Sequence, residues 1–230
     1  MPPMSDAGLR VSSLRAFLVA VVMLVAPLAA LGGVPEPAER PISTDVLELA
    51  FSAASCAVRA GSVQAPATLT VIDYSKPSTE KRLWVLDMRT RAVLYEELVA
   101  HGSGTGDGMA TSFSNTPETH KSSLGLFVTA ETYVGRNGYS LRLNGLDEGF
   151  NDRARERAIV MHGAPYVSEA FAQAQGRLGR SWGCPALREA VARELIDRVK
   201  GGNLLFVYYP DQKWLNTSEY LGDCAAASQP

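Results

Sequence analysis

The sequence predicts a mostly-β domain of the α+β class, a single β-rich sandwich or barrel-like domain with a few flanking helices. Runs rich in β-branched and aromatic residues recur between turn residues from position 68 to position 209, a pattern typical of strands. These runs do not alternate regularly with helical patterns, which argues against repeated β-α-β units. With 230 residues, 46% of them hydrophobic, the chain can bury a core in one domain.

Residues 1–33 have the composition of a secretory signal segment. Arg10 and Arg15 precede the apolar run 16–26, and Pro27 and several small residues follow it. A positive segment, an apolar core and a small-residue exit form the pattern of an export signal. The alternative is an uncleaved membrane anchor, but the run is short for a span of ~20 residues. We expect an exported protein, periplasmic or extracellular and cell-wall associated, that contacts the membrane only if this segment is retained.

The next elements are expected in order along the chain. Residues 34–65 combine a proline-rich linker with a helix that begins near Ser43 or Thr44 and ends at Gly61. Strand patterns cover 68–74, 82–88, 92–102, 124–134, 139–143, 158–162 and 203–209. A helix is expected from Pro185 to Lys200, because proline favours the first helical turn and glycine follows the end. The main domain is therefore placed at 66–210, with residues 211–230 as a C-terminal tail.

The candidate chemistry lies between Ile159 and Leu187. His162 and Cys184 are 22 residues apart and each is next to a glycine, as side chains displayed at strand ends or tight turns tend to be. Thiol chemistry needs a thiolate, and an ordinary thiol with a pKa of ~8.5 is mostly protonated at neutral pH. An imidazole within hydrogen-bond reach can take that proton. We therefore interpret Cys184 as a nucleophile and His162 as its base.

The expected helix at Pro185 adds an electrostatic argument. It would place Cys184 at or beside a helix N-terminus, where the dipole stabilises an anion and lowers a thiol pKa. The backbone N–H groups of Trp182, Gly183 and Cys184 would then form an oxyanion hole for acyl transfer. Gly183 has no side chain, so a substrate backbone can approach closely.

Cys56, Cys184 and Cys224 are the cysteines of the chain. An exported protein meets an oxidising environment that permits disulfides. If Cys184 stays free as the nucleophile, Cys56 and Cys224 remain as a pair that would tie both ends of the chain to the domain. The alternative is a buried Cys56 and an unpaired thiol at Cys224, because pairing cannot be deduced from sequence alone.

These residues resemble the L,D-transpeptidase family of peptidoglycan enzymes, with a YkuD-type catalytic domain. The resemblance covers about residues 66–210, and its most specific segments are I-V-M-H-G-A from Ile159 and G-R-S-W-G-C-P-A from Gly179. It is closest to the divergent branch of murein L,D-transpeptidase catalytic domain proteins. Supporting segments are V-L-D at Val85, V-A-H-G-S-G at Val99, F-S-N at Phe113, S-S-L-G at Ser122 and Y-S-L-R-L-N-G-L at Tyr139.

The resemblance implies a covalent mechanism on peptidoglycan stem peptides. Cys184 matches the nucleophile that forms a thioacyl intermediate, and His162 matches its base. The Gly163 backbone carbonyl takes the position that holds the imidazole tautomer, and Ser181 matches the Ser/Thr of the S/T-H-G-C signature. Trp182 departs from that signature, because the better-known branch carries a second His there.

Three functions remain open from sequence. An L,D-transpeptidase would pass the acyl group to an amine and so cross-link or remodel the cell wall. An L,D-carboxypeptidase or amidase would pass it to water. A catalytically weak domain would only bind cell wall. The retained Cys and His argue against the third function, and the lost second His argues mildly for it.

Arg180, His101 and Tyr139 are further candidates for the substrate site. Arg180, beside the segment that carries Cys184, can bind a carboxylate through the several N–H donors of its guanidinium, or it can brace a loop. His101 ends a strand at a glycine-rich loop, where a functional or a structural role is equally expected. Tyr139 can wall the site, although aromatic residues more often pack in cores.

Charge and motif content limit the other partners. A net charge of −2 argues against a nucleic-acid partner, because such proteins carry a basic face. The sequence contains no C-x-x-C or H-E-x-x-H motif, so no metal and no organic cofactor is expected.

Overall fold

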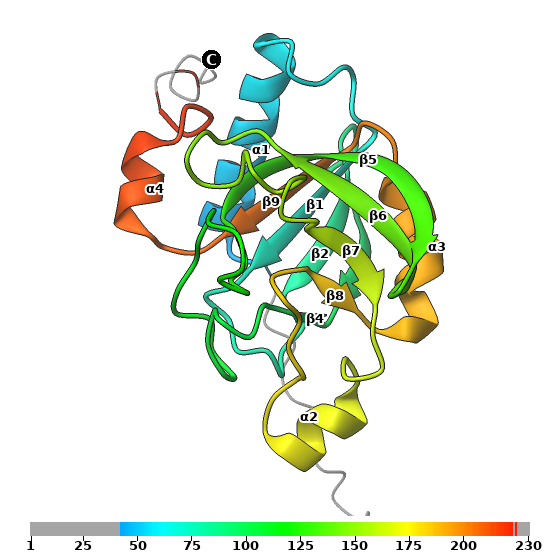
Figure 1. Cartoon of the computed structure of the whole chain (residues 1–230). Helices are drawn as coiled ribbons and strands as arrows, with labels where there is room; N and C mark the ends of the chain where they lie inside the picture. Colours follow the sequence, from blue (N-terminus) through cyan, green and yellow to red (C-terminus); the bar gives the residue numbers. More distant parts are fainter. Residues whose placement is uncertain (1–41, 223, 225–230) are drawn as a thin grey trace, which may run out of the picture. The chain divides into compact units, whose positions relative to one another are not determined.

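The computed structural model describes residues 42–222 and 224, so the expected signal segment 1–33 lies outside the described residues. The described part contains a nine-stranded sheet and four helices (Figure 1). Its strands are β1 Thr68–Asp73, β2 Leu83–Asp87, β3 Val93–Glu97, β4 Val99–Ala100, β5 Gly125–Gly135, β6 Gly138–Gly145, β7 Val160–Gly163, β8 Ala186–Leu187 and β9 Leu204–Tyr208. Its helices are α1 Thr44–Arg59, α2 Glu169–Gln175, α3 Glu189–Val199 and α4 Gln212–Thr217. The prediction of a mostly-β α+β domain is confirmed.

The sheet curls because the chain connects its two edges. The strand order is β3-β2-β1-β9-β5-β6-β7-β8-β4, so β3 and β4 lie at opposite ends. Only Leu98 separates these two strands in the sequence. An open, flat sheet of this order would hold Glu97 and Val99 far apart, since neighbouring strands are ~4.8 Å apart. The edges therefore come together, which gives the barrel-like form.

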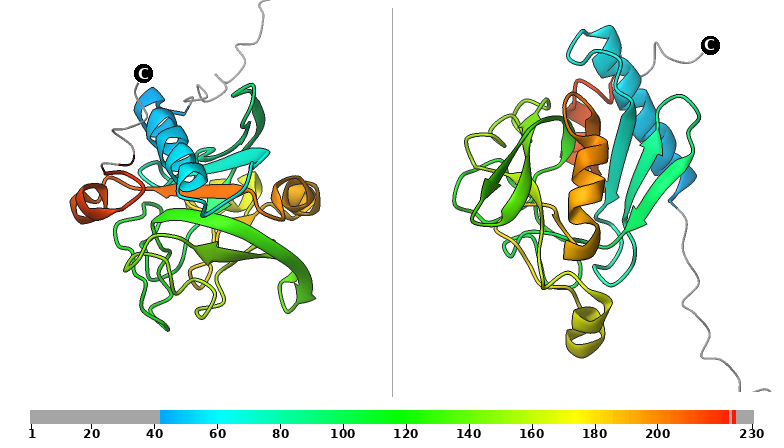
Figure 2. Two further views of the ribbon diagram at one scale, coloured as in Figure 1. Left: turned by 90° about the horizontal axis from the view of Figure 1, so that it is seen from above. Right: turned by 90° about the vertical axis from the view of Figure 1, so that its right-hand side faces the viewer.

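The helices cover different parts of this curled sheet. α1 packs on β1 and β9 through small buried residues, Ala50, Ala53, Ala54 and Ala57. α3 packs chiefly on β7, the strand that carries His162. In the view from above, β9 runs between α4 and α3 (Figure 2). None of the helices in the described part is long and apolar enough to cross a membrane.

The helix expected from Pro185 begins later than predicted. Ala186 and Leu187 form β8, which pairs with β4 on one side and with β7 on the other. These pairings with distant strands override the local helix signal of Pro185, and α3 starts only at Glu189. The prediction that Cys184 lies at a helix N-terminus is therefore wrong.

Two further helices lie in segments where none was expected. α2 lies within the connection between His162 and Cys184, capped by Ser168, whose hydroxyl accepts from the Phe171 N–H, and it ends at Gly176 with φ +68°. α4 occupies part of the segment expected to be a tail, and Asp211 caps it by accepting from the Trp214 N–H.

The β5–β6 hairpin turns through Arg136 and Asn137. Gly135 pairs with Gly138 across the two strands, and Gly138 adopts a left-handed φ of +70°, which glycine accepts without strain. The Asn137-Gly138 pair predicts this hairpin, and the structure places its tip at the pocket described below.

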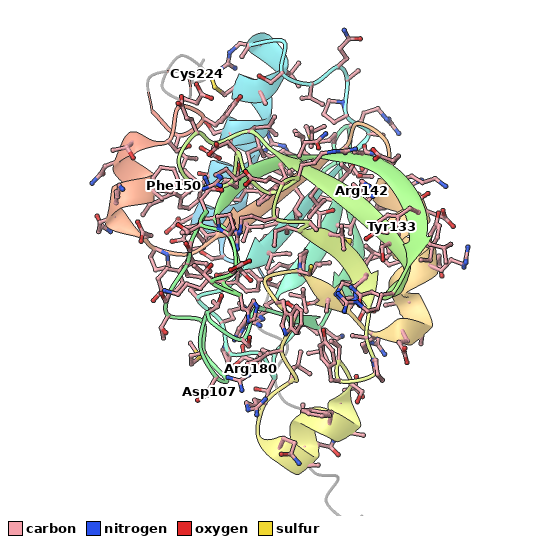
Figure 3. All side chains as sticks on the ribbon, in the orientation of Figure 1. Asp107, Tyr133, Arg142, Phe150, Arg180 and Cys224 are labelled. Carbon is pink, nitrogen blue, oxygen red and sulfur yellow. A yellow bond between two sulfur atoms is a disulfide. The ribbon has the colours of Figure 1, made fainter. Side chains whose placement is uncertain are left out.

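A disulfide between Cys56 on α1 and Cys224 closes the chain near its C-terminus, with the two Cα atoms 5.6 Å apart. Cys224 is labelled beside α1 in Figure 3. Cys184 is free and buried. The bond spans 168 residues of chain, and a cross-link over such a long loop removes much of the conformational freedom of the unfolded state.

We expect one reactive thiol per molecule in denatured, unreduced protein, and the double variant Cys56→Ala, Cys224→Ala to lose about 2–4 kcal/mol of unfolding free energy. Thiol titration and denaturant unfolding measure the two quantities. Three reactive thiols in unreduced protein would contradict the bond, and equal unfolding free energies would contradict its role in stability.

Candidate active site

His162 lies on β7, an inner strand of the sheet. It pairs with Ser140 of β6 and with Ala186 of β8, so strands hold its backbone on both sides. Its Nδ1 lies 2.9 Å from the carbonyl oxygen of Gly163. A carbonyl can only accept, so Nδ1 carries the hydrogen and Nε2 keeps its lone pair. Burial lowers the pKa of His162 from 6.5, and the ring is therefore a neutral base at neutral pH.

Cys184 follows Gly183 at the end of a loop, and 8% of the residue is exposed. Its Sγ accepts from the Val160 N–H at 3.5 Å and lies 3.8 Å from the Ala158 carbonyl. Burial raises the pKa of this thiol above 9.0, while the Val160 N–H and the charge of Arg157 lower it. Because α3 begins at Glu189, its dipole acts one turn too far along the chain to stabilise the thiolate.

Cys184 and His162 line one pocket of about 440 Å³. The other lining residues come from the hairpin tip, the turn before β7, the loop after β7 and the loop that carries Cys184: Tyr133, Arg136, Asn137, Arg157, Ala158, Val160, Tyr166, Arg180, Ser181 and Trp182. In the described part of the chain no hydrogen bond joins the sulfur to the imidazole. The pocket therefore brings the candidate nucleophile and its candidate base together without a preformed hydrogen bond between them.

Ser181 fixes the loop 181–184, which presents the cysteine and is named the nucleophile loop after the proposed role of Cys184. Its hydroxyl donates to the Cys184 carbonyl at 2.6 Å and accepts from the Gly183 N–H at 3.1 Å. The Gly183 N–H is therefore occupied, which removes it from the expected oxyanion hole. The N–H groups of Trp182 and Cys184 carry no hydrogen bond within the described residues. They remain as donors for a developing oxyanion.

Gly183 is required where it stands. Its φ of +113° belongs to a region that side chains rarely adopt, and an added Cβ would lie 2.8 Å from the Lys121 carbonyl oxygen. On the other side, the Gly183 carbonyl accepts from the Ser122 hydroxyl at 3.1 Å. The loop around residues 121 and 122 thus supports the residue just before the nucleophile.

His101 lies outside the pocket lining. It is 1% exposed, and its Nδ1 lies 2.8 Å from Nη2 of buried Arg82 while its Nε2 lies 3.3 Å from the Gly106 carbonyl. Burial and the charge of Arg82 lower its pKa to about 4, so the ring is neutral. Its backbone carbonyl accepts from the Ser181 N–H at 3.0 Å. The structure thus gives His101 a bracing position behind the nucleophile loop.

Tyr139 also points away from the pocket. Its hydroxyl donates to Asp197 of α3 at 2.6 Å, and the Arg193 guanidinium lies 4.3 Å from its ring centroid. Tyr139 is therefore a contact between β6 and α3, and the neighbouring hairpin residue Tyr133 takes the expected place at the pocket wall. Tyr133 itself supports Arg142, whose guanidinium lies 4.3 Å above its ring (Figure 3).

Arg180 does line the pocket, and its charge is already partly engaged. Its Nη1 donates to Asp107 at 2.6 Å and to the Gly106 carbonyl at 3.2 Å. Figure 3 shows Arg180 and Asp107 together at one end of the domain. The other guanidinium N–H groups have no partner among the described residues, so the fork retains donors for a ligand carboxylate.

Trp182 forms an exposed wall at the pocket. The residue is 65% exposed and its ring stacks on His120, with centroids 4.8 Å apart and planes within 6°. The Arg136 guanidinium at the hairpin tip lies 5.8 Å from the same ring. Hairpin, nucleophile loop and the loop containing His120 therefore meet at this indole.

Arg157 and Tyr166 are among the pocket residues that the sequence reasoning missed. Tyr166 packs over Gly179, where an added Cβ would clash with the ring, and burial with the nearby Cys184 raises the Tyr166 pKa to about 12. Gly179 is the only local sequence sign of this packing. Arg157 stands in a charged run before β7, where surface arginines are common, and no local pattern separates it from Arg153 or Arg155.

No group of three or more His, Cys, Asp or Glu side chains in the described part of the chain is placed to hold a metal ion. The pocket offers the chemistry of a thiol, a neutral imidazole and oriented backbone N–H groups. These are the parts of a covalent acyl-transfer site.

Comparisons with known proteins give the family. Residues 38–208 match the model described as the L,D-transpeptidase catalytic domain. No curated protein matches the chain. Among solved structures, an L,D-transpeptidase from Mycobacterium smegmatis is 16% identical with a TM-score of 0.40, covering 62% of this chain and 59% of that one.

A second solved structure is the helical cell shape determining protein Pgp2 from Campylobacter jejuni, 12% identical with a TM-score of 0.43, covering 65% of this chain and 50% of that one. The chain thus spans 59% of the length of the first protein and 50% of the second. The family model, in contrast, spans most of this chain. The protein belongs to the L,D-transpeptidase catalytic domain family.

Proposed function

We propose that the protein is an L,D-transpeptidase, an acyltransferase that uses Cys184 on peptidoglycan stem peptides and so cross-links or remodels the cell wall. One observation carries the proposal. The base His162, with Nδ1 held by the Gly163 carbonyl at 2.9 Å, lines the same pocket as the free thiol of Cys184. A nucleophile, a base and a third group that orients the base form the minimal set for this chemistry.

The first half of the reaction forms a thioester. Nε2 of His162 takes the proton of the Cys184 thiol as the sulfur attacks the stem-peptide carbonyl. The N–H groups of Trp182 and Cys184 stabilise the oxyanion of the tetrahedral intermediate. The imidazolium then gives its proton to the leaving amine, and a D-amino acid departs. The hydrogen bond from sulfur to imidazole forms when substrate is bound, as catalytic hydrogen bonds often do.

The second half passes the acyl group to an amine. The amine of a neighbouring stem attacks the thioester, and His162 removes its proton. The tetrahedral intermediate collapses, the new amide leaves, and the Cys184 sulfur recovers its proton from the imidazolium. Arg180, with free donors on its guanidinium, is placed to bind a carboxylate of one of the two stems. Water in place of the amine would give hydrolysis.

We place the mature enzyme outside the cytoplasmic membrane. The signal-like composition of residues 1–33 supports this location. The Cys56–Cys224 disulfide also supports it, because such bonds persist in oxidising compartments.

We expect Cys184→Ala to abolish both the thioester adduct and all product, because Cys184 is the free thiol of the described pocket lining. Intact-mass spectrometry with purified muropeptides measures the adduct, and chromatography measures product. Cross-linked dimers indicate transfer, and shortened stems indicate hydrolysis. The matched control is the Cys56→Ala, Cys224→Ala double variant, which keeps Cys184 and should still form the adduct. Turnover in Cys184→Ala would refute the nucleophile.

We expect His162→Gln to lower the rate of thioester formation by ~10²–10⁴, the usual loss when a general base is removed. Gln keeps a polar group of similar size, so a thermal-unfolding midpoint near that of the wild type would separate catalysis from folding. Stopped-flow acylation measures the rate. An unchanged rate in the folded variant would assign the base to another residue.

We expect the acid limb of the acylation rate to lie below pH 6.5. Burial lowers the pKa of His162 from that value, so the ring stays unprotonated, and able to accept a proton, at lower pH than a free imidazole. The rate should therefore fall only as pH drops through this lowered pKa. A profile of kcat/KM against pH measures the limb. A midpoint above 6.5 would contradict a buried neutral base.

A further inference from the structure

Arg157 is a half-buried cation that has no anionic partner among the described residues. Its guanidinium donates to three uncharged acceptors, the carbonyls of Ser114 and Lys121 and the hydroxyl of Ser123, each at 2.6 Å. Its Nε is buried and has no hydrogen-bond partner. No carboxylate pairs with it among the described residues. A charge that is partly removed from water is less favourable when no opposite charge compensates it.

Arg157 and Cys184 are brought together by the turn before β7. Both residues line the same pocket. Ala158, the next residue, contacts the sulfur through its carbonyl at 3.8 Å, and the Val160 N–H donates to it at 3.5 Å. Ala158 has a left-handed φ of +51°, an uncommon conformation for alanine. This turn brings the Arg157 side chain and the backbone contacts of the thiol to the same pocket.

Cys184 presents the complementary problem. Burial makes its thiolate unfavourable, and α3 begins too late to help. His162 is neutral at rest, so it supplies no positive charge until it has taken the proton. The buried thiol must become an anion, and the half-buried guanidinium in the same pocket lacks an anion, so the two groups match in charge and in place.

We propose that Arg157 is the counter-ion of the Cys184 thiolate and so a positioning residue for the reaction, acting through the charge of the sulfur. The inference rests on the proposed role of Cys184 as nucleophile. On ionisation the thiol proton passes to Nε2 of His162, while the guanidinium keeps all its protons. The pair of Cys184 and Arg157 is then neutral, and the free energy cost of the buried thiolate falls.

The other charged and titratable groups that face Cys184 are less suited to this role. They are Tyr74, Tyr133, Arg136, His162, Tyr166 and Arg180. Arg180 is paired with Asp107, and Arg136 lies over the exposed Trp182 ring. Burial raises the pKa of both Tyr74 and Tyr166 to about 12, so these two are neutral at neutral pH. The Tyr133 ring is engaged with the guanidinium of Arg142.

A purely structural role for Arg157 is the competing explanation. Its Nη2 holds the carbonyl of Lys121, the atom against which Gly183 packs without room for a side chain. Loss of this contact would disturb the nucleophile loop whatever the charge at position 157. If Arg157 acts through its charge, only a neutral replacement should raise the thiol pKa. If its role is purely structural, a neutral and a positively charged replacement should cause equal losses.

The test is the pH dependence of Cys184 alkylation by iodoacetamide in the full chain. The Cys56–Cys224 bond leaves Cys184 as the free thiol, so alkylation reports on it alone. We expect Arg157→Gln to raise the apparent thiol pKa by about one unit, which is about a tenfold loss of rate at neutral pH. Arg157→Lys, which keeps the charge but loses the fork, should stay close to the wild type.

Arg155→Gln is the matched control. Arg155 is two residues away, exposed, and paired with Glu131 at 2.6 Å, and it is absent from the pocket lining. Its profile should superpose on that of the wild type.

If Arg157→Gln does not fold, Ser123→Asp decides the question. It keeps the arginine and gives its guanidinium a carboxylate partner at a hydroxyl position already 2.6 Å away. The same upward shift of the thiol pKa is expected. An unchanged profile in the folded neutral variant, or equal losses in Gln and Lys, would overturn the proposal. Thioester formation by the wild-type protein tests the proposed function separately, because the alkylation profile needs no peptidoglycan.

Discussion

The path of the chain through Leu98 constrains the rest of the domain. Glu97 ends one edge strand of the sheet and Val99 begins the other. Two cations hold this crossing. Arg82, fully buried, donates to the Val99 carbonyl from Nε at 3.0 Å and from Nη2 at 2.8 Å, and Arg188 forms a two-point ion pair with Glu97 at 2.7 and 2.8 Å. Removing one partner would leave a buried charge unpaired, so the two edges are held together and the sheet stays curled.

The pocket is a consequence of this closure. β4 joins the far edge beside β8 and leads directly into His101, whose ring is held by the same Arg82. The His101 carbonyl then holds the Ser181 N–H, and Ser181 holds the two ends of the turn that presents Cys184. A chain of hydrogen bonds therefore connects buried Arg82, through His101 and Ser181, to Cys184. Of the two histidines in this region, the more deeply buried His101 supports the site from behind, and His162 lines it.

Local sequence patterns predicted the features that are determined by residues close together in the sequence. The strand runs, the hairpin before Gly138 and the glycines beside His162 and Cys184 are all visible in the sequence, and the fold class followed from them. The start of α3 did not follow, because Ala186 and Leu187 obtain their hydrogen bonds from strands distant in sequence. The orientations of Tyr139 and Arg157 were hidden for the same reason: their partners, on α3 and in the loop 114–123, are contacts of the folded state. The Ser168 and Gly176 caps of α2 were local signals that could have been used.

The electrostatics of the pocket bear on how a buried thiol can be reactive. A thiolate–imidazolium pair at rest would need charge on two groups whose burial disfavours it. The neutral pair is the resting form that burial favours, and it protects the sulfur from other electrophiles, because the thiolate is the reactive species. In the proposed reaction, ionisation then occurs with substrate in place, when the proton moves to His162. The Val160 N–H and the Arg157 charge favour the thiolate from fixed positions. They therefore stabilise it without any reorganisation of the protein at that moment. A site built this way is reactive toward a bound carbonyl and comparatively inert when empty.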